Sequence, residues 1–182
     1  GGKEGKITST FILFYLVPKL NAAGRLGNAD RAFRLLISEN AEEAASLTEE
    51  LISENTKRQA AEAEITQQAM QPENLVTGED DAVVVALGTD WHPGVIGIVA
   101  SRLTEKYGKP SFVLVKDSED TAKGSARSVK GFDLHKALSG CAGLLERFGG
   151  HEMAAGLGIR LENLRPFIDS LNKYGAEHSQ YI

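Results

Sequence analysis

Hydrophobic and polar positions divide the chain into a helical first part and a second part in which strands and helices alternate. Residues 10–18, TFILFYLVP, form an unbroken apolar run. This run is too short to cross a bilayer, for which about 20 residues are needed, and we interpret it as buried core. A short helix is predicted over 29–37, with Asn28 as its N-cap.

A long helix, predicted over 41–70, has apolar residues at helical spacing near both ends but not in its middle. Asn40 and Glu43 resemble a capping box at its start, with Asn in the place of Ser or Thr. Asn55 and Arg58 interrupt the apolar stripe, so we expect the helix to pack at both ends and to cross a gap or groove between them. A solvated surface helix explains the acidic remainder equally well, and both interpretations stay open.

The second part of the chain has the pattern of an α/β fold. Residues 71–81 contain Pro, Gly and acidic residues, which predicts a linker or turn region. Four strands are then expected, over 82–88, 111–117, 122–129 and 154–160, and three helices, over 93–108, 133–148 and 162–175. This order predicts a mixed sheet in an α/β layer.

Composition is ordinary for a soluble globular protein: the 182 residues are 42% hydrophobic and 25% charged. A single cysteine, Cys141, excludes a disulfide framework and is typical of a reducing cytoplasm. The net charge of −5 argues against a protein-wide attraction for nucleic acid. Residues 39–64 hold eight acidic and two basic residues, whereas 123–136 holds four basic residues and one acidic residue. The second cluster is compatible with an anion-binding face.

Motifs for a complete catalytic centre are missing from the sequence. The four histidines lack metal-binding spacing, and there is no cysteine pair, Asp-His-His cluster, P-loop or G-x-S-x-G motif. The first residue is not Met and the chain opens abruptly on apolar residues, so we expect a piece of a longer protein. Taken alone, the chain does not look like a complete enzyme.

Two stretches of the second part suit phosphate binding. In GTDWHPGVIG (88–97) a turn precedes a helix, whose N-terminus attracts anions, and Trp91 is placed to stack on a base. The alternative is that Trp91 packs the start of the helix and His92 lies in solvent. In GSARS (124–128), Ser125 and Arg127 share one strand face and, with Ser128, suit a phosphate clamp; a polar hairpin strand is the alternative.

Two further stretches carry an arginine or a histidine next to glycine. AGRLGNADR (23–31) contains Arg25, for which pairing with a carboxylate is the simpler interpretation. In FGGHEMAAG (148–156), Gly149 and Gly150 permit positive φ and close backbone approach. His151 can then donate to a phosphate oxygen, although a histidine in a structural turn is the more common case.

Taken together and in this order, these motifs resemble those of the DHH/DHHA1 phosphoesterase family, and within it the RecJ-like exonucleases specific for single-stranded DNA. The matching stretches are LNAAGRLGNA, LISENTKRQAAEAEI, WHPGVIGIVASRL, GSARS and FGGHEMAAG. The resemblance implies that 1–37 is the end of a DHH domain, 38–71 a connector helix, and 72–182 a substrate-binding DHHA1-type domain with a mixed β-sheet flanked by helices.

The resemblance also implies a function and a set of site residues. The whole protein would be a 5′–3′ exonuclease of DNA repair and recombination that uses Mn²⁺ or Mg²⁺ bound by a DHH domain upstream of this chain. This chain would hold no metal and would be inactive alone. His151 would reach the scissile phosphate, and the substrate-binding residues would be Arg25, Trp91, His92, Ser125, Arg127, Ser128, Gly149 and Gly150. The family often has three glycines before this histidine, where this chain has Phe148 in the first position.

The expected partner is single-stranded DNA, with a single-strand-binding protein or a helicase in the context of the whole protein and no membrane. An oligonucleotide-binding domain commonly follows in RecJ-like proteins. Two alternatives stay open: a phosphodiesterase of short oligonucleotides or cyclic dinucleotides, and a non-catalytic nucleic-acid-binding scaffold of the same fold.

Overall fold

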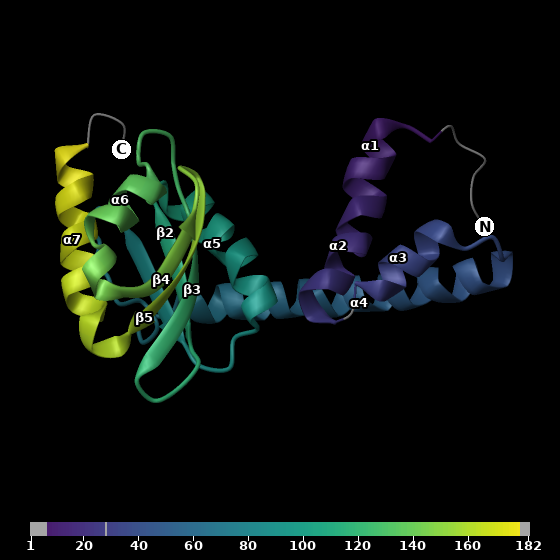
Figure 1. Ribbon diagram of the computed structural model, residues 1–182, viewed down its shortest axis with the longest axis horizontal. Helices are drawn as coiled ribbons and strands as arrows, with labels where there is room; N and C mark the ends of the chain where they lie inside the picture. The colour runs from purple at the N-terminus through teal and green to yellow at the C-terminus, as the bar shows by residue number, and fades with distance from the viewer. Residues whose placement is uncertain (1–6, 28, 179–182) are drawn as a thin grey trace. The chain divides into compact units, whose positions relative to one another are not determined.

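The computed structural model of the protein describes residues 7–27 and 29–178. Its contacts divide the chain into two compact units, Gly1–Ala61 and Glu62–Ile182. The first unit is helical, and the second is a sheet covered by helices (Figure 1). Among the described residues, no helix is both long and apolar enough to cross a membrane. The predicted domain boundaries at 37/38 and 71/72 stay predictions.

The first unit is built from short helices and the first part of a long one. Its elements are α1 (Ser9–Phe11), the π-helical segment η1 (Ile12–Leu16), α2 (Val17–Leu26), α3 (Asp30–Ile37) and α4 (Ala41–Ala69), which continues into the second unit. A small core joins Ala23, Ala32 and Leu51. The short helix over 29–37 is confirmed, whereas Asn28, its expected N-cap, lies outside the described residues.

The apolar run 10–18 is helical, and the expectation that it is buried core is wrong. Phe11 is 48% exposed and Phe14 is 77% exposed. Successive residues of a helix point about 100° apart, so an unbroken apolar run places hydrophobic side chains on every side of the helix. The described part of the unit leaves residues 11–15 exposed.

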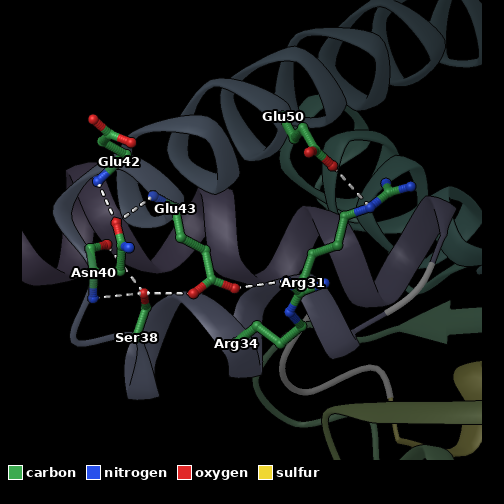
Figure 2. Close-up of polar contacts among 7 residues, drawn as sticks. All are labelled: Arg31, Arg34, Ser38, Asn40, Glu42, Glu43 and Glu50. Carbon is green, nitrogen blue, oxygen red and sulfur yellow. Dashed lines mark hydrogen bonds and ion pairs between the residues drawn. The ribbon is translucent and has the colours of Figure 1, made fainter.

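Asn40 caps the start of α4, as predicted, although the capping box closes in a different way (Figure 2). Its side-chain oxygen accepts hydrogen bonds from the amides of Glu42 (2.8 Å) and Glu43 (3.2 Å). The Glu43 carboxylate accepts from the hydroxyl of Ser38 (3.1 Å), and that hydroxyl oxygen accepts from the Asn40 amide (3.3 Å). The hydroxyl of Ser38 therefore lies between the Asn40 amide and the Glu43 carboxylate, which would bond directly in a standard capping box. Arg34 also donates to Glu43 (2.6 Å), which lowers the pKa of Glu43 and raises that of Arg34.

The middle of α4 carries a buried polar residue that is hydrogen-bonded within the helix. Asn55 is 8% exposed, and its side-chain oxygen accepts from Nε (3.3 Å) and Nη2 (3.1 Å) of Arg58. Arg31 of α3 forms ion pairs with Glu50 (3.1 Å) and Glu54 of α4, which lie two turns and one turn before Arg58 (Figure 2 shows the first pair). Four apolar residues of the predicted stripe are buried, as expected: Leu47, Leu51, Ile65 and Ala69. The fifth, Ala44 in the first turn, is half-buried. The gap or groove that this helix was expected to cross stays a prediction.

The second unit contains one mixed sheet of five strands. Its strands are β1 (Val84–Gly88), β2 (Ser111–Lys116), β3 (Thr121–Arg127), β4 (Leu145–Gly150) and β5 (Ala154–Arg160), in the order β1-β2-β3-β5-β4. The β1–β2 pair is parallel and the other pairs are antiparallel. The predicted α/β fold with a mixed sheet is confirmed, and so is β3 as the antiparallel neighbour of β2. Residues 71–81 form turns, with a single bridge from Leu75 to Ala86 of β1.

Helices cover the two faces of this sheet unequally. Between the strands run α5 (Pro93–Tyr107), α6 (Leu134–Gly140) and the 3₁₀ turns η2 (Ala142–Leu144) and η3 (Leu161–Asn163), and α7 (Leu164–Glu177) closes the chain. α6 and α7 lie on one side of the sheet and α5 on the other (Figure 1). The main core lies on the α6–α7 side, where Phe112 meets Phe167 edge to face at 5.7 Å. On the opposite face α5 lies against β1, β2 and β3, and Gly149 of β4 and Gly156 of β5 are exposed there.

The helix predicted over 133–148 is wrong in its second half, which forms η2 and β4. β4 carries a bulge between Leu145 and Arg147. Because of this extra residue, Leu145 and Phe148 both pack against the core, although residues three apart in a regular strand point to opposite faces. A spacing of three is also typical of a helix, which explains the wrong prediction.

Candidate anion-binding groove

A cavity of about 370 Å³ opens on the α5 face of the sheet, where Gly149 of β4 and Gly156 of β5 are exposed. One wall is the first turn of α5, with Pro93 and Ile96. The strands contribute Lys123, Gly124, Ser125, Arg147, Phe148, Gly149, Gly156 and Leu157. This lining contains two cations and no carboxylate. We call this cavity the groove, and its charge suits an anion.

Strand pairing brings together groove residues that are far apart in the sequence. Ser125 of β3 lies opposite Gly156 of β5, which lies opposite Gly149 of β4. A Cβ added at Gly149 would meet nothing within 4 Å, and one at Gly156 would meet only the Gly124 carbonyl oxygen, at 3.8 Å. The middle row of the groove therefore has a floor of backbone that a ligand can approach closely.

Arg127 shares the face of Ser125, as the sequence predicted. A Cβ added at Gly97 of α5 would lie 3.1 Å from Nη2 of Arg127 and 3.5 Å from Oγ of Ser125. Gly97 therefore lets α5 lie close to these two side chains and hold them on the sheet. The second terminal nitrogen of the guanidinium, Nη1, donates to the carbonyl of Ala126 (2.8 Å). Ser125 and Arg127 are thus positioned next to the groove by the packing of α5 on β3.

Ser128 is buried and hydrogen-bonded to the backbone, so the structure gives no support to its expected place in the phosphate clamp. The residue is 7% exposed, and its hydroxyl donates to the carbonyl of Phe132 at 2.6 Å. Its amide donates to the carbonyl of Met153 (3.1 Å). Ser128 follows the last residue of β3, so the chain has left the strand face that Ser125 and Arg127 share. Its role is to fix the turn after β3.

Trp91 is buried, and the structure does not support its stacking on a base. It is 4% exposed, and a Cβ added at Gly88 would lie 2.5 Å from Cδ2 of its ring, so the ring packs on that glycine. Its indole N–H donates to the side-chain oxygen of Gln68 at 2.7 Å. His92 is exposed and caps α5, because its Nδ1 accepts from the Gly94 amide (3.1 Å). The structure therefore agrees with the alternative interpretation of this stretch, in which Trp91 packs at the start of the helix and His92 lies in solvent.

Gly149, Gly150 and His151 differ in what their positions require. Gly150 has φ +148°, and a Cβ there would lie 2.6 Å from Cα of Ala155, so glycine is required. Gly149 has no such restriction. His151 is exposed at the β4–β5 turn, where its amide donates to the Ala154 carbonyl (2.9 Å) and its Nδ1 accepts from the Met153 amide (3.3 Å). A neutral ring in this arrangement carries its proton on Nε2, which is a donor.

Comparison with known proteins identifies this sheet domain. Residues 80–177 match the DHHA1 domain. The chain belongs to the DHHA1 domain family. It is 40% identical over 174 residues to the single-stranded-DNA-specific exonuclease RecJ of Bacillus subtilis, and 38% identical over 159 residues to that of Thermus thermophilus.

The solved structures agree with this assignment. The crystal structure of RecJ from Thermus thermophilus in complex with Mg²⁺ has a TM-score of 0.84 and 33% identity, with 95% of this chain and 27% of that chain covered. The matched part is 95% of this chain and 22% of the Bacillus protein, and 87% of this chain and 22% of the Thermus protein. The chain therefore spans about a fifth of the length of these two relatives.

Arg147 was not among the candidates drawn from the sequence, and Lys123 appeared only as part of a local charge. Arg147 was missed because 133–148 had been predicted to be a helix. The alternation of Lys123, Ser125 and Arg127 along β3 is a signal that places all three on one face. Arg25 lies in the last turn of α2 in the first unit, half-buried. Its contact with a phosphate stays a prediction.

The described residues offer no metal centre beside the groove. No group of three or more His, Cys, Asp or Glu side chains in residues 7–27 and 29–178 is arranged to hold a metal ion. The Thermus RecJ structures contain Mg²⁺ or Mn²⁺. That this chain holds no metal of its own stays a prediction.

Proposed function

We propose that the chain is the strand-binding part of a RecJ-like exonuclease, which removes nucleotides from the 5′ end of single-stranded DNA in repair and recombination. The observation that carries the proposal is the groove: a glycine floor with Lys123 and Arg147 beside it and no carboxylate in its lining. The 40% sequence identity with Bacillus subtilis RecJ, over an alignment that covers 95% of this chain, supports the same proposal.

Within this function the site residues take different roles. Ser125 and Arg127 contact a phosphate at the α5 side of the groove, because both are held there against Gly97. His151, at the turn that follows Gly149 and Gly150, donates from Nε2 toward the scissile phosphate. His92 supports α5 as its cap, and Arg25 contacts a further phosphate.

The chemistry needs Mn²⁺ or Mg²⁺, which RecJ structures from Thermus thermophilus contain, and we assign its ligands to residues of a DHH domain outside this chain. The 182-residue chain alone is therefore expected to bind single strands and to leave them intact. The whole enzyme would work in the cytoplasm, together with a single-strand-binding protein or a helicase. The chain's three predicted parts, 1–37, 38–71 and 72–182, are assigned to the end of the DHH domain, the connector and the DHHA1 domain.

Binding is tested with the 182-residue chain and a fluorescent oligothymidylate, by anisotropy between about 50 and 200 mM NaCl. We expect weak binding that falls as salt rises, with a log–log slope of about −0.7 for each phosphate contacted. Arg127→Ala should weaken binding, whereas Arg165→Ala on α7, which pairs with Asp169 at 3.1 Å, should not. Affinity that does not change with salt would contradict a phosphate-dominated mode.

Activity is tested in a chimera in which this chain replaces the matched 174 residues of Bacillus subtilis RecJ. With Mn²⁺ the chimera should degrade long single strands from the 5′ end, and His151→Ala should abolish this. Preferential hydrolysis of dinucleotides would instead support the phosphodiesterase alternative. The 182-residue chain with Mn²⁺ is the control, and degradation by it would refute the assignment of the metals outside the chain.

A further inference from the structure

Two basic side chains face the groove without any acidic partner. Neither Lys123 nor Arg147 makes an ion pair or side-chain hydrogen bond with another residue in the described part of the chain. Elsewhere arginines are paired, with nitrogen–oxygen distances of 3.1 Å or less: Arg31, Arg34, Arg102, Arg160 and Arg165. Two adjacent cations without a carboxylate repel each other, and an anion between them removes that cost.

The sheet places these two cations opposite each other across a glycine. Lys123 of β3 pairs with Gly158 of β5, which pairs with Arg147 of β4. A Cβ added at Gly158 would lie 3.1 Å from Cγ and 3.2 Å from Nε of Arg147. The stem of Arg147 thus lies over Gly158, on the side toward Lys123, and a side chain at position 158 would displace it.

The spacing along β3 matches a nucleic-acid backbone. Lys123 lies two residues before Ser125 on the same face, which is about 6.6 Å along a strand. Adjacent phosphates of an extended single strand are separated by a similar distance. In the Ser125 row, next to the row of Lys123, Gly158 and Arg147, the floor is the open backbone of Gly156 and Gly149.

We propose that Lys123 and Arg147 form a second phosphate site, which holds the phosphate adjacent to the one bound at Ser125 and Arg127. The sugar between the two phosphates lies over Gly156 and Gly149. The ligand class is a phosphodiester of a single strand or a terminal phosphate monoester, and the site contacts phosphate without reading the base. This assignment rests on the proposed function, because it extends the same strand by one nucleotide.

The test compares thymidine 5′-monophosphate with thymidine 3′,5′-bisphosphate, by calorimetry at low salt with the 182-residue chain. The bisphosphate should bind roughly tenfold more tightly, as expected for an added charge-assisted contact. In Lys123→Gln/Arg147→Gln this gain should vanish, while the affinity for the monophosphate is kept. The Gln side chains retain part of each stem, and emission from Trp91, which is buried in the same unit, checks that the domain is folded.

The matched control is Lys116→Gln/Arg165→Gln, which removes the same charge from the end of β2 and from α7, and it should keep the full gain. The groove variant should also bind oligothymidylate and oligouridylate with salt slopes less steep by about 0.7, since one phosphate contact is lost from each. A change confined to one of the two polymers would overturn a site that reads phosphate alone.

Failure of this assignment can be told apart from failure of the proposed function. If the groove variant keeps the tenfold gain while Arg127→Ala still weakens strand binding, the second phosphate site is wrong and the proposed function stands. If the unaltered chain binds neither nucleotide nor either polymer, both are wrong.

Discussion

Two adjacent glycines, Gly149 and Gly150, should respond in opposite ways to the same substitution. Gly150 has φ +148°, a backbone conformation that residues with a side chain rarely adopt. A Cβ there would lie 2.6 Å from Cα of Ala155 and closer still to the carbonyl oxygen of Ala154, and these are backbone atoms that cannot rotate away. Gly149 has no positive φ and nothing within 4 Å of an added Cβ.

Alanine at 150 should therefore destabilise the domain by about 2 kcal/mol or more, since backbone strain of this kind costs about 1–3 kcal/mol before the clash is counted. For a chain of this size each kcal/mol lowers the melting temperature by about 2–4 °C. Alanine at 149 should leave stability within about 0.5 kcal/mol of the original chain, as for most open surface positions. It should nevertheless weaken nucleotide binding, because the added methyl group would enter the groove.

Urea unfolding followed by Trp91 fluorescence is the assay, because this single tryptophan is buried in the second unit and reports on it alone. Nucleotide binding is measured on the same two variants by calorimetry. Equal unfolding midpoints for Gly149→Ala and Gly150→Ala would refute the assignment of strain to Gly150. Unchanged nucleotide affinity in Gly149→Ala would refute the claim that the ligand closely approaches the backbone at Gly149.

Three other predictions concern the groove's surroundings. Ser128→Ala should lower the free energy of unfolding in urea by about 1–2 kcal/mol, because it leaves the Phe132 carbonyl without its donor. It should not change the salt slope of strand binding. A changed slope would indicate that Ser128 contacts a phosphate after all. Gln68→Leu should lower the free energy of unfolding, followed by circular dichroism, by about 1–3 kcal/mol, since the Trp91 N–H loses its acceptor. An equal loss of stability in Gln67→Leu, at the exposed neighbouring position, would argue against this reason. Burial raises the pKa of the Cys141 thiol to about 11, so the native chain should react slowly with a thiol reagent at pH 8 and the unfolded chain quickly. Because the folded chain keeps this proton to a higher pH than the unfolded chain, the thiol should lower stability only as pH rises from about 9 toward 11.

The sequence by itself determined the elements whose signals are local. Pro93 and Gly108 mark the start and stop of α5, and Gly108 has the left-handed φ of +64° that such a stop requires. The apolar run of β1 and the alternation along β3 predicted a mixed α/β sheet, and the order of the motifs predicted the DHHA1 family. Each of these signals lies within a few residues, where spacing and capping chemistry decide the structure.

Tertiary structure decided the features that depend on residues far apart. The groove exists because strand pairing places Lys123, Gly158 and Arg147 in one row, and no local pattern specifies that register. The bulge in β4 gave a strand the spacing of a helix, so Arg147 could not be placed from the sequence. The sequence around Trp91 is compatible both with stacking on a base and with packing on Gly88. The packed position is stabilised by Gln68 of α4, a residue distant in the sequence that accepts the indole hydrogen bond. Burial and pairing are properties of the assembled chain, because they depend on which distant side chain occupies the neighbouring space.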